Sequence, residues 1–278
     1  MPGSEARIDP RDETQKLEHA LRAAGAIALK FFRGNVRSWF KSEDSPVSEA
    51  DIAVDRFLRE VLARPDIGWL SEESEDDLSR LEARRLYIVD PIDGTRSYLA
   101  GRPDWSIAAA LVEDGRPVAA AIFAPTDDEM FVATAGGGAS LNGRPLHATP
   151  GSSLRGARIA GPQRYLDRLA QAAPDIVRAP KIHSLALRLA RVAEGRIDAG
   201  LASVHAHDWD LAAADLLVHE AGGVMTDASG NALVYNLHNP MHGALIAAGR
   251  DRHQAVLALM GDSRMGDSRT GDSWKQLS

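Results

Sequence analysis

Three apolar runs between Trp105 and Thr134 constrain the fold more than any other part of the sequence. They read W-S-I-A-A-A-L-V, P-V-A-A-A-I-F-A and E-M-F-V-A-T, and turn signals separate them at Asp114-Gly115 and at Thr126-Asp127-Asp128. Runs of this length bounded by Gly and Asp are typical of β-strands joined by tight turns. Because short turns join antiparallel neighbours, the sequence predicts an antiparallel meander here.

Helices and further strands are predicted on both sides of this meander. Apolar residues recur at helical spacing from Thr14 to Phe32, and a second helix is expected from Ser48, its N-cap, to Leu62. Helices that alternate with mixed strands favour a layered α+β domain. The other predicted helices are 164–173, 185–194 and 210–220, and the other predicted strands are 68–70, 86–89, 199–203, 223–225 and 243–248.

Composition excludes several classes of function. The 278 residues include no cysteine, which excludes disulfides, thiolate metal sites and cysteine nucleophiles, so any metal must be held by oxygen or imidazole. The formal net charge of -7 and the lack of a basic stripe argue against nucleic-acid binding. No apolar run approaches the roughly 20 residues that span a bilayer, and the first residues lack an apolar signal core. We therefore expect a cytoplasmic protein without membrane contact.

Four acidic segments contain the candidate functional residues. Asp51 ends S-P-V-S-E-A-D, Glu72 lies in W-L-S-E-E-S, Asp90 and Asp93 lie in V-D-P-I-D-G-T, and Asp210 lies in H-D-W-D-L-A-A-A-D. Taken singly, each has a structural explanation as a helix-start acid, a solvated charged run or an Asp-rich turn. Glu72 and Asp90, however, both follow strand-like runs and are expected at one sheet edge. Carboxylates so close repel one another unless cations or strong hydrogen-bond donors hold them.

In combination, these segments resemble the inositol monophosphatase superfamily of magnesium-dependent, lithium-sensitive phosphatases. The resemblance rests on V-D-P-I-D-G-T, on the upstream Glu72-Glu73 pair, and on Trp209-Asp210 followed by E-A-G-G at Glu220 to Gly223. It covers about residues 14–250. It implies a five-layer αβαβα sandwich of the α+β class, with the metal site between two halves, and a homodimer.

Three regions are expected along the chain. Residues 1–150 form an N-terminal α+β half that carries the metal-site motifs, and residues 151–260 form a C-terminal α/β half that contributes Asp210. Residues 261–278 contain three consecutive polar units, G-D-S-R-M, G-D-S-R-T and G-D-S-W-K. Because these units are too short and polar to bury a core, we expect a disordered tail.

The resemblance also implies the metal ligands. Glu72, Asp90 and the main-chain carbonyl of Ile92 hold one Mg²⁺ ion, and Asp90, Asp93 and Asp210 hold a second, so that Asp90 bridges them. Two or three ions per site are expected. Hard oxygen ligands of this kind are those that Mg²⁺ prefers.

The implied reaction is in-line attack of metal-activated water on a phosphate monoester. Thr95 and Asp51 are the residues expected to position and deprotonate that water, and Glu72 is counted with them as catalytic. Gly94 and Thr95 are expected to offer main-chain amides to the phosphate oxygens at a helix start.

Finer motifs indicate the substrate class. K-S-E-D-S-P-V-S-E-A-D, L-S-E-E and L-A-L-R-L-A-R-V-A-E-G resemble the 3'(2'),5'-bisphosphate nucleotidases, so the first expectation is a nucleotide such as 3'-phosphoadenosine 5'-phosphate. Arg188 either binds its second phosphate through a planar fork or faces solvent on its helix. Inositol-specific members carry an acid seven positions before the second-motif Asp, where this chain has Ser203, also a candidate substrate contact. Inositol 1-phosphate is the alternative, and D-G-T-R-S-Y-L-A-G also resembles histidinol-phosphate phosphatases.

Two further alternatives concern the residues next to Trp209-Asp210 and the possibility of a function without catalysis. His205, His207 and Asp208 either contact substrate at the rim of the site or have structural roles, whereas Trp209 is expected to pack in the core. A non-catalytic regulatory binding protein is the hypothesis from a different class. The complete set of inferred ligands and the acidic charge argue against it.

Overall fold

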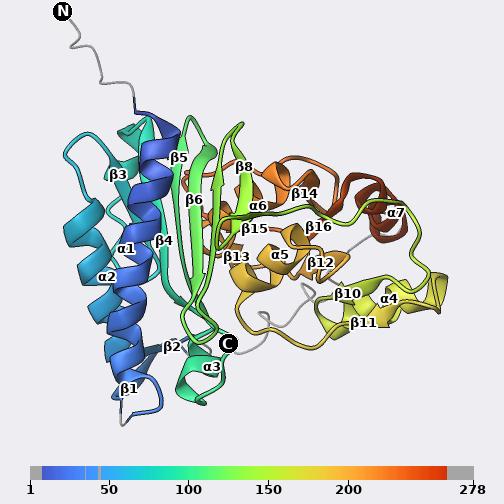
Figure 1. Ribbon diagram of the computed structural model, residues 1–278, viewed down its shortest axis with the longest axis horizontal. Helices are drawn as coiled ribbons and strands as arrows, with labels where there is room; N and C mark the ends of the chain where they lie inside the picture. Colours follow the sequence, from blue (N-terminus) through green and yellow to red (C-terminus); the bar gives the residue numbers. More distant parts are fainter. Residues whose placement is uncertain (1–7, 35, 43–44, 262–278) are drawn as a thin grey trace, which may run out of the picture.

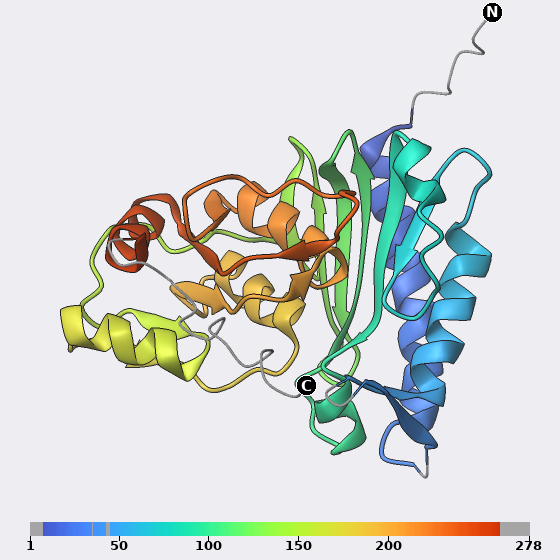
Figure 2. The ribbon, with the colours of Figure 1, turned by 180° about the vertical axis from the view of Figure 1, so that it is seen from behind.

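Helices and sheets alternate in five layers (Figures 1 and 2). The computed structural model describes residues 8–34, 36–42 and 45–261. A sheet lies between each two of the three helical layers, which confirms the expected αβαβα sandwich. The layers hold α1 (Pro10–Phe31) with α2 (Glu49–Leu62), then α5 (Leu185–Ala193) with α6 (Asp208–Glu220), then α4 (Gln163–Ala172) with α7 (Arg250–Gly261).

The first sheet has seven strands in the order β3-β4-β5-β6-β7-β8-β9. The predicted meander is confirmed as three antiparallel neighbours, β5, β6 and β7. Asp114 and Gly115 join the first two with φ values of 50° and 75°, the positive values that a two-residue hairpin turn requires. The bounds are β3 Gly68–Ser71, β4 Arg85–Asp93, β5 Ser106–Glu113, β6 Arg116–Ala124, β7 Glu129–Thr134, β8 Gly138–Leu141 and β9 Arg144–Pro145.

The second sheet has five strands in the order β11-β10-β12-β16-β14, which are β11 (Val177–Arg178), β10 (Arg158–Ala160), β12 (Ala199–Ala202), β16 (Leu245–Gly249) and β14 (Gly223–Asp227). Two small two-stranded sheets accompany it. They pair β1 (Ser38–Ser42) with β2 (Ser45–Ser48), and β13 (Ala206–His207) with β15 (Met241–His242). The 3₁₀ helix η1 (Ser79–Glu82) and the short α3 (Thr95–Leu99) complete the described elements.

Both faces of the first sheet are buried, because helices cover each of them. Along β4, Tyr87 and Val89 pack in the core beneath α1 and α2, whereas Leu86 and Ile88 pack in the core that includes α5 and α6. A strand buried on both faces has no polar side to alternate with its apolar side. The continuous apolar runs in the sequence follow from this burial.

Some boundaries differ from expectation. Helix α1 begins at Pro10 rather than Thr14, because Asp9 caps it by accepting a hydrogen bond from the Arg11 main-chain N–H at 2.9 Å. The predicted tail lies outside the described residues apart from Gly261, and the division of the chain at residue 150 stays a prediction. No helix in the described ranges is both long and apolar enough to cross a bilayer.

Candidate active site

Two strands and one helix bring acidic side chains to one end of the first sheet. β3 and β4 are parallel with Ser71 opposite Val89, so Glu72 and Asp90 follow at adjacent positions. The Glu72 main-chain N–H donates to the Val89 carbonyl at 3.3 Å. The expectation that Glu72 and Asp90 share a sheet edge is therefore confirmed. Asp210 reaches the same place from the first turn of α6.

A β-bulge lets Asp90 and Asp93 face the same pocket. Residues three apart on a regular strand point to opposite faces of the sheet. In β4, however, Asp90 lies opposite Ala108 and Asp93 lies opposite Ser106, so three steps on β4 match two on β5. The extra residue reverses the alternation. The V-D-P-I-D spacing therefore produces a pair of converging carboxylates only because the strand is irregular here.

Carboxylate oxygens of Asp90, Asp93 and Asp210 lie within 4.8 Å of one another. Asp93 is held by the start of α5, where the Ser184 hydroxyl and the Ala186 N–H each donate to it at 2.6 Å. Asp210 accepts a 2.6 Å hydrogen bond from the His207 N–H. Neither carboxylate oxygen of Asp90 has a hydrogen-bond partner among the described residues, although both are buried. Unpartnered buried carboxylate oxygens beside two more carboxylates are the donor set that suits a hard cation such as Mg²⁺.

The electrostatics of the cluster favour either protons or cations. Burial raises the pKa of Asp90 well above its ordinary value, and the charges of Glu72, Asp93 and Asp210 raise it further. Burial, then the charge of Asp93, raises the pKa of Asp210 to about 7. Burial also raises the pKa of Asp93, although the bonds from the start of α5 oppose this rise. A divalent ion would offset both the burial and the mutual repulsion that raise these pKa values.

Asp51 and Thr95 lie together beside the acidic cluster. The capping box of α2 fixes Asp51, whose Oδ2 accepts from the Ser48 N–H at 2.8 Å and from the Ser48 hydroxyl at 2.6 Å. The other oxygen lies 3.3 Å from the Thr95 hydroxyl, which also lies 3.0 Å from the Ile92 carbonyl oxygen. Burial raises the pKa of Asp51. The structure thus brings together the two residues that the resemblance implied for handling water.

Gly94 allows the chain to turn from β4 into α3. Its φ is 92°, and an added Cβ would lie 3.1 Å from both the Asp104 carbonyl oxygen and the Ser184 nitrogen. Only glycine adopts this conformation without strain at so close an approach. Gly94 therefore lets the acidic turn pack directly against the loop before α5.

The acidic side chains line a pocket of about 290 Å³. Pro46, Arg96 and His183 also line it and were not among the predicted site residues. The only sequence signal for His183 is its place one residue before Ser184, the N-cap of α5. The full lining is Pro46, Glu72, Asp90, Ile92, Asp93, Gly94, Thr95, Arg96, His183 and Asp210.

Arg188 and Ser203 are not among the residues that line this pocket. The half-buried Arg188 donates to the Ile182 carbonyl at 2.8 and 3.2 Å and to the Leu201 carbonyl at 3.3 Å. Its guanidinium therefore connects the loop before α5 with β12, and the alternative of a solvent-facing residue was wrong. A phosphate contact for Arg188 stays a prediction, as does a substrate contact for Ser203.

The residues around the Trp-Asp motif have structural contacts. Buried Asp208 lies 2.7 Å from His242 Nε2 and accepts from the Asn236 N–H at 2.9 Å. The His207 ring stacks on Trp209 with centroids 4.5 Å apart, and Trp209 packs against the core as expected. At the end of α6, Glu220 accepts 2.8 Å hydrogen bonds from the N–H groups of Gly136 and Gly138. These contacts fix the helix that carries Asp210.

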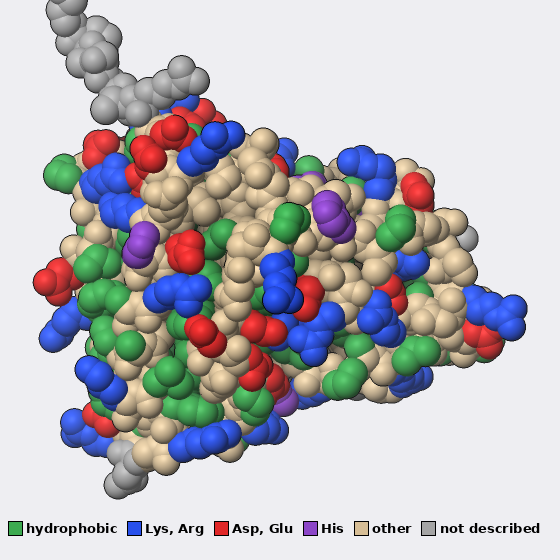
Figure 3. Space-filling model, in the orientation of Figure 1, with side chains coloured by type: hydrophobic (Ala, Val, Ile, Leu, Met, Phe, Trp, Pro, Cys, Tyr) green, Lys and Arg blue, Asp and Glu red, His purple; other side chains and the backbone are tan. Residues whose placement is uncertain are grey.

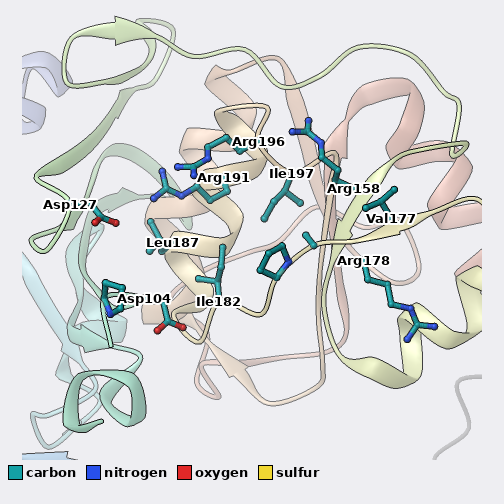
Figure 4. A pocket seen from close by; sticks show the side chains of 13 residues that line it. Asp104, Asp127, Arg158, Val177, Arg178, Ile182, Leu187, Arg191, Arg196 and Ile197 are labelled. Atoms are coloured by element: carbon teal, nitrogen blue, oxygen red, sulfur yellow. The ribbon is translucent and has the colours of Figure 1, made fainter. Parts of the chain in front are cut away.

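A separate cavity of about 430 Å³ adjoins the acidic pocket (Figure 4). Asp104 and Ile182 line it, and the neighbouring His183 lines the acidic pocket. Four arginines also line this cavity, and three of them form ion pairs at 3.1 Å or less. They are Arg158, Arg178, Arg191 and, with longer contacts of 3.7 and 4.0 Å, Arg196.

Comparison with known proteins agrees with this geometry. Residues 10–263 match the inositol monophosphatase family. An inositol-1-monophosphatase of Rhizobium meliloti (strain 1021) is 36% identical over 228 residues, which are 77% of this chain and 84% of the relative. A Nus factor SuhB of Xylella fastidiosa (strain Temecula1 / ATCC 700964) is 35% identical over 227 residues, covering 76% and 80% of the two chains.

A solved structure shows the same fold. The crystal structure of the extragenic suppressor protein suhB from Bartonella henselae superposes with a TM-score of 0.79 at 28% sequence identity. The match covers 91% of this chain and 100% of that one. With the family match, the curated relatives and the acidic pocket in agreement, the chain belongs to the inositol monophosphatase family of metal-dependent phosphatases.

Proposed function

We propose that this metal-dependent phosphomonoesterase hydrolyses the phosphate monoester of a cyclic polyol, with inositol 1-phosphate as the representative substrate. The observation that carries the proposal is the buried carboxylate of Asp90 beside Asp93 and Asp210, which has no hydrogen-bond partner in the part of the chain that the structure describes. Mg²⁺ held by Glu72, Asp90, the Ile92 carbonyl, Asp93 and Asp210 would supply positive charge to the phosphate oxygens and lower the pKa of a water molecule. Two or three ions per site remain the expected number.

Asp51 and Thr95 would position and deprotonate the attacking water. The Thr95 hydroxyl can accept from the water while it donates to the Asp51 carboxylate or to the Ile92 carbonyl. Because Ser48 binds the far oxygen of Asp51, the near oxygen is directed at Thr95. A raised pKa makes Asp51 a better proton acceptor than an ordinary carboxylate. The Gly94 and Thr95 amides would bind phosphate oxygens at the turn into α3.

Two observations favour a polyol phosphate over a bisphosphorylated nucleotide. The relative from Rhizobium meliloti is named inositol-1-monophosphatase. Arg188, a candidate for a second-phosphate contact, bonds to main-chain carbonyls and is not among the residues that line the acidic pocket. Of K-S-E-D, also taken as a nucleotidase feature, residues 43 and 44 lie outside the described residues.

The bisphosphorylated nucleotide remains the second candidate because of the neighbouring cavity. Arg178 and Arg196 line it with side chains 42% and 59% exposed (Figure 4). Asp104 also lines it, and its carboxylate lies 2.7 Å from His183 Nδ1. A second phosphate that extended past Asp104 would meet these guanidinium groups. Direct binding of a long nucleic acid is not favoured, since Lys and Arg are interspersed with Asp and Glu on the face seen in Figure 3.

The test is phosphate release from inositol 1-phosphate and 3'-phosphoadenosine 5'-phosphate, measured side by side with Mg²⁺ and with excess chelator. We expect faster, strictly Mg²⁺-dependent hydrolysis of inositol 1-phosphate, and loss of both activities in Asp90→Asn. Faster hydrolysis of the nucleotide would favour the second candidate. Failure to hydrolyse either ester under any metal condition, or activity in the presence of chelator, would overturn the proposal.

A further inference from the structure

His183 lies in the wall of the acidic pocket, but it belongs to none of the acidic motifs. It directly precedes Ser184, whose hydroxyl holds Asp93 at 2.6 Å, and it lines the pocket with Asp90, Asp93 and Asp210. Its side chain is 22% exposed. The imidazole is neither packed in the core nor fully exposed on the surface, so we consider the hydrogen-bond partner of each ring nitrogen.

Asp104 fixes the orientation of the His183 ring. The same oxygen, Asp104 Oδ2, accepts the His183 main-chain N–H at 2.9 Å and lies 2.7 Å from Nδ1. The Asp104 carbonyl in turn accepts the Ser184 N–H at 3.3 Å. Because the loop and the ring are both bonded to Asp104, the ring has little freedom to turn away from the pocket.

The partner of Nδ1 also decides which ring atom carries a proton. Burial acts to raise the pKa of Asp104, but the hydrogen bonds from His183 outweigh it and the pKa is lowered. An ionised carboxylate is an acceptor only, so Nδ1 must be the donor in this pair. Nε2 is then the ring's one remaining polar atom, and no hydrogen bond reaches it from any residue that the structure describes.

A hydroxyl group suits Nε2 better than a phosphate oxygen does. In the neutral ring with Nδ1–H, Nε2 is an acceptor, and a deprotonated phosphate oxygen cannot donate to it. A hydroxyl group can donate to the neutral ring and accept from the protonated one, so it satisfies Nε2 in either state. The group lost from the phosphate monoester in the proposed reaction is an alcohol, and further hydroxyls on its carbon skeleton would be near the wall of the pocket.

We infer that His183, oriented by Asp104, is a specificity-determining residue that hydrogen-bonds a hydroxyl of the substrate's alcohol part. This inference rests on the proposed function, and it gives a positive reason for a polyol substrate. It assigns the choice of alcohol to a side chain on the loop before α5. The metal-binding acids, by contrast, recognise the phosphate common to all candidate esters.

The experiment compares two esters with the same ring. In inositol 1-phosphate, each of the remaining ring carbons carries a hydroxyl group, whereas cyclohexyl phosphate has no hydroxyl on its ring. The asparagine in His183→Asn keeps a donor near the position of Nδ1 but has no atom at the position of Nε2, and the longer amide in His183→Gln reaches that position. His19→Asn makes the same chemical change on the exposed face of α1 and serves as the control. Rates are measured at saturating Mg²⁺.

We expect His183→Asn to lower kcat/KM for inositol 1-phosphate about tenfold more than for cyclohexyl phosphate, as expected for the loss of one hydrogen bond. His183→Gln should recover part of that loss, and His19→Asn should behave as the wild type. Where turnover of cyclohexyl phosphate is slow, its inhibition constant against inositol 1-phosphate replaces kcat/KM. The ratio between the two esters is a readout that a merely structural role of His183 would not change.

Two results would overturn the inference while the proposed function stands. An equal loss on both esters would place His183 at the phosphate or in the scaffold, and an unchanged ratio without loss would remove it from recognition. If the wild-type protein hydrolysed neither these esters nor 3'-phosphoadenosine 5'-phosphate with Mg²⁺, the proposed function would fail, and the inference would fail with it.

Discussion

Buried Arg80 connects the segment after Glu72 to the loop that holds the start of α6, the helix that carries Asp210. Its removal should affect both stability and metal binding. Its side chain is 1% exposed. The guanidinium bonds to Asp76 at 2.8 to 3.0 Å, and it donates to Asn236 Oδ1 at 2.7 Å and to the Leu237 carbonyl at 3.0 Å.

Asn236 continues the connection to the start of α6. Its side-chain amide donates to the Arg80 carbonyl at 3.1 Å, and its main-chain N–H donates to Asp208 at 2.9 Å. Asp208 is two residues from Asp210, and Asp76 is four residues from Glu72. One arginine thus connects the segment after Glu72 to the loop at Asn236, which bonds the start of the helix that carries Asp210.

We expect Arg80→Met to lower the free energy of unfolding by about 3 kcal/mol. Removing one partner of a buried ion pair costs about 3 to 5 kcal/mol, and the lower end applies because the Asp76 side chain remains 26% exposed. The control is Arg84→Met, since Arg84 is 51% exposed and its pairs with Glu113 and Asp114, both at 3.1 Å, are surface contacts. That change should cost less than about 1 kcal/mol.

The assay is urea unfolding of both variants without Mg²⁺, followed by titration of activity with Mg²⁺. Arg80→Met should need severalfold more Mg²⁺ for half-maximal activity, because Glu72 and Asp210 lose their common anchor. Equal stabilities for Arg80→Met and Arg84→Met would refute the buried connection. A large loss of stability with an unchanged Mg²⁺ requirement would refute the coupling to the metal site.

Three further predictions concern the acidic pocket. Asp90→Asn should abolish turnover yet stabilise the metal-free fold, because burial and the charges of Glu72 and its neighbours oppose ionisation of the Asp90 carboxyl, whereas an amide carries no charge. A thermal scan should also lose the Mg²⁺-induced rise in Tm, and a retained rise would contradict the assignment. Thr95→Ala should lower kcat by about 100-fold while calorimetry finds Mg²⁺ affinity little changed, and an unaltered kcat would remove Thr95 from the mechanism. The pKa of Asp210 is raised from 3.8 to about 7 in the fold, so the folded state holds a proton that the unfolded state releases. The contribution of this bound proton to the free energy of unfolding is complete below pH 3.8 and is lost as the pH rises through about 7. The stability of the metal-free wild type should therefore fall over this range relative to that of Asp210→Asn. Parallel pH profiles of stability for the two proteins would contradict the prediction.

Local sequence patterns predicted much of the fold because the signals are local. The Asp114-Gly115 turn specifies its hairpin through positive φ values, and Ser48 with Asp51 specifies the start of α2 through a capping box. The same argument explains the error at α1, where the capping Asp9 lies before the first residue of the apolar periodicity. Each of these features depends on residues within a few positions of one another.

The acidic site was recognised from motifs, but its geometry was not predictable from them. Asp90 and Asp93 converge only through the bulge opposite β5, and Asp93 is held by Ser184 and Ala186, more than 90 residues away in the chain. For Arg188 the sequence leaves a phosphate contact, still a prediction, or a solvent-facing position, whereas its guanidinium bonds to carbonyls of two other segments. Helical periodicity identified its helix but not the partners of its side chain.

The sequence by itself determined the order of the helices and strands with strong apolar patterns, the absence of thiol chemistry and the identity of the acidic residues, since these follow from residue type and short-range spacing. Short elements such as β1, β2, β10 and β11, and the last helix α7, were not predicted. Only the tertiary structure decided that Asp90 has no hydrogen-bond partner within the described ranges, that Asp51 meets Thr95, and that Asp104 orients His183 beside the acids. Such contacts join segments that are far apart in the chain, and these segments meet only when the two sheets pack around α5 and α6. Burial between those layers then raises the pKa values of the carboxylates, so that a bound proton or a bound cation is favoured there.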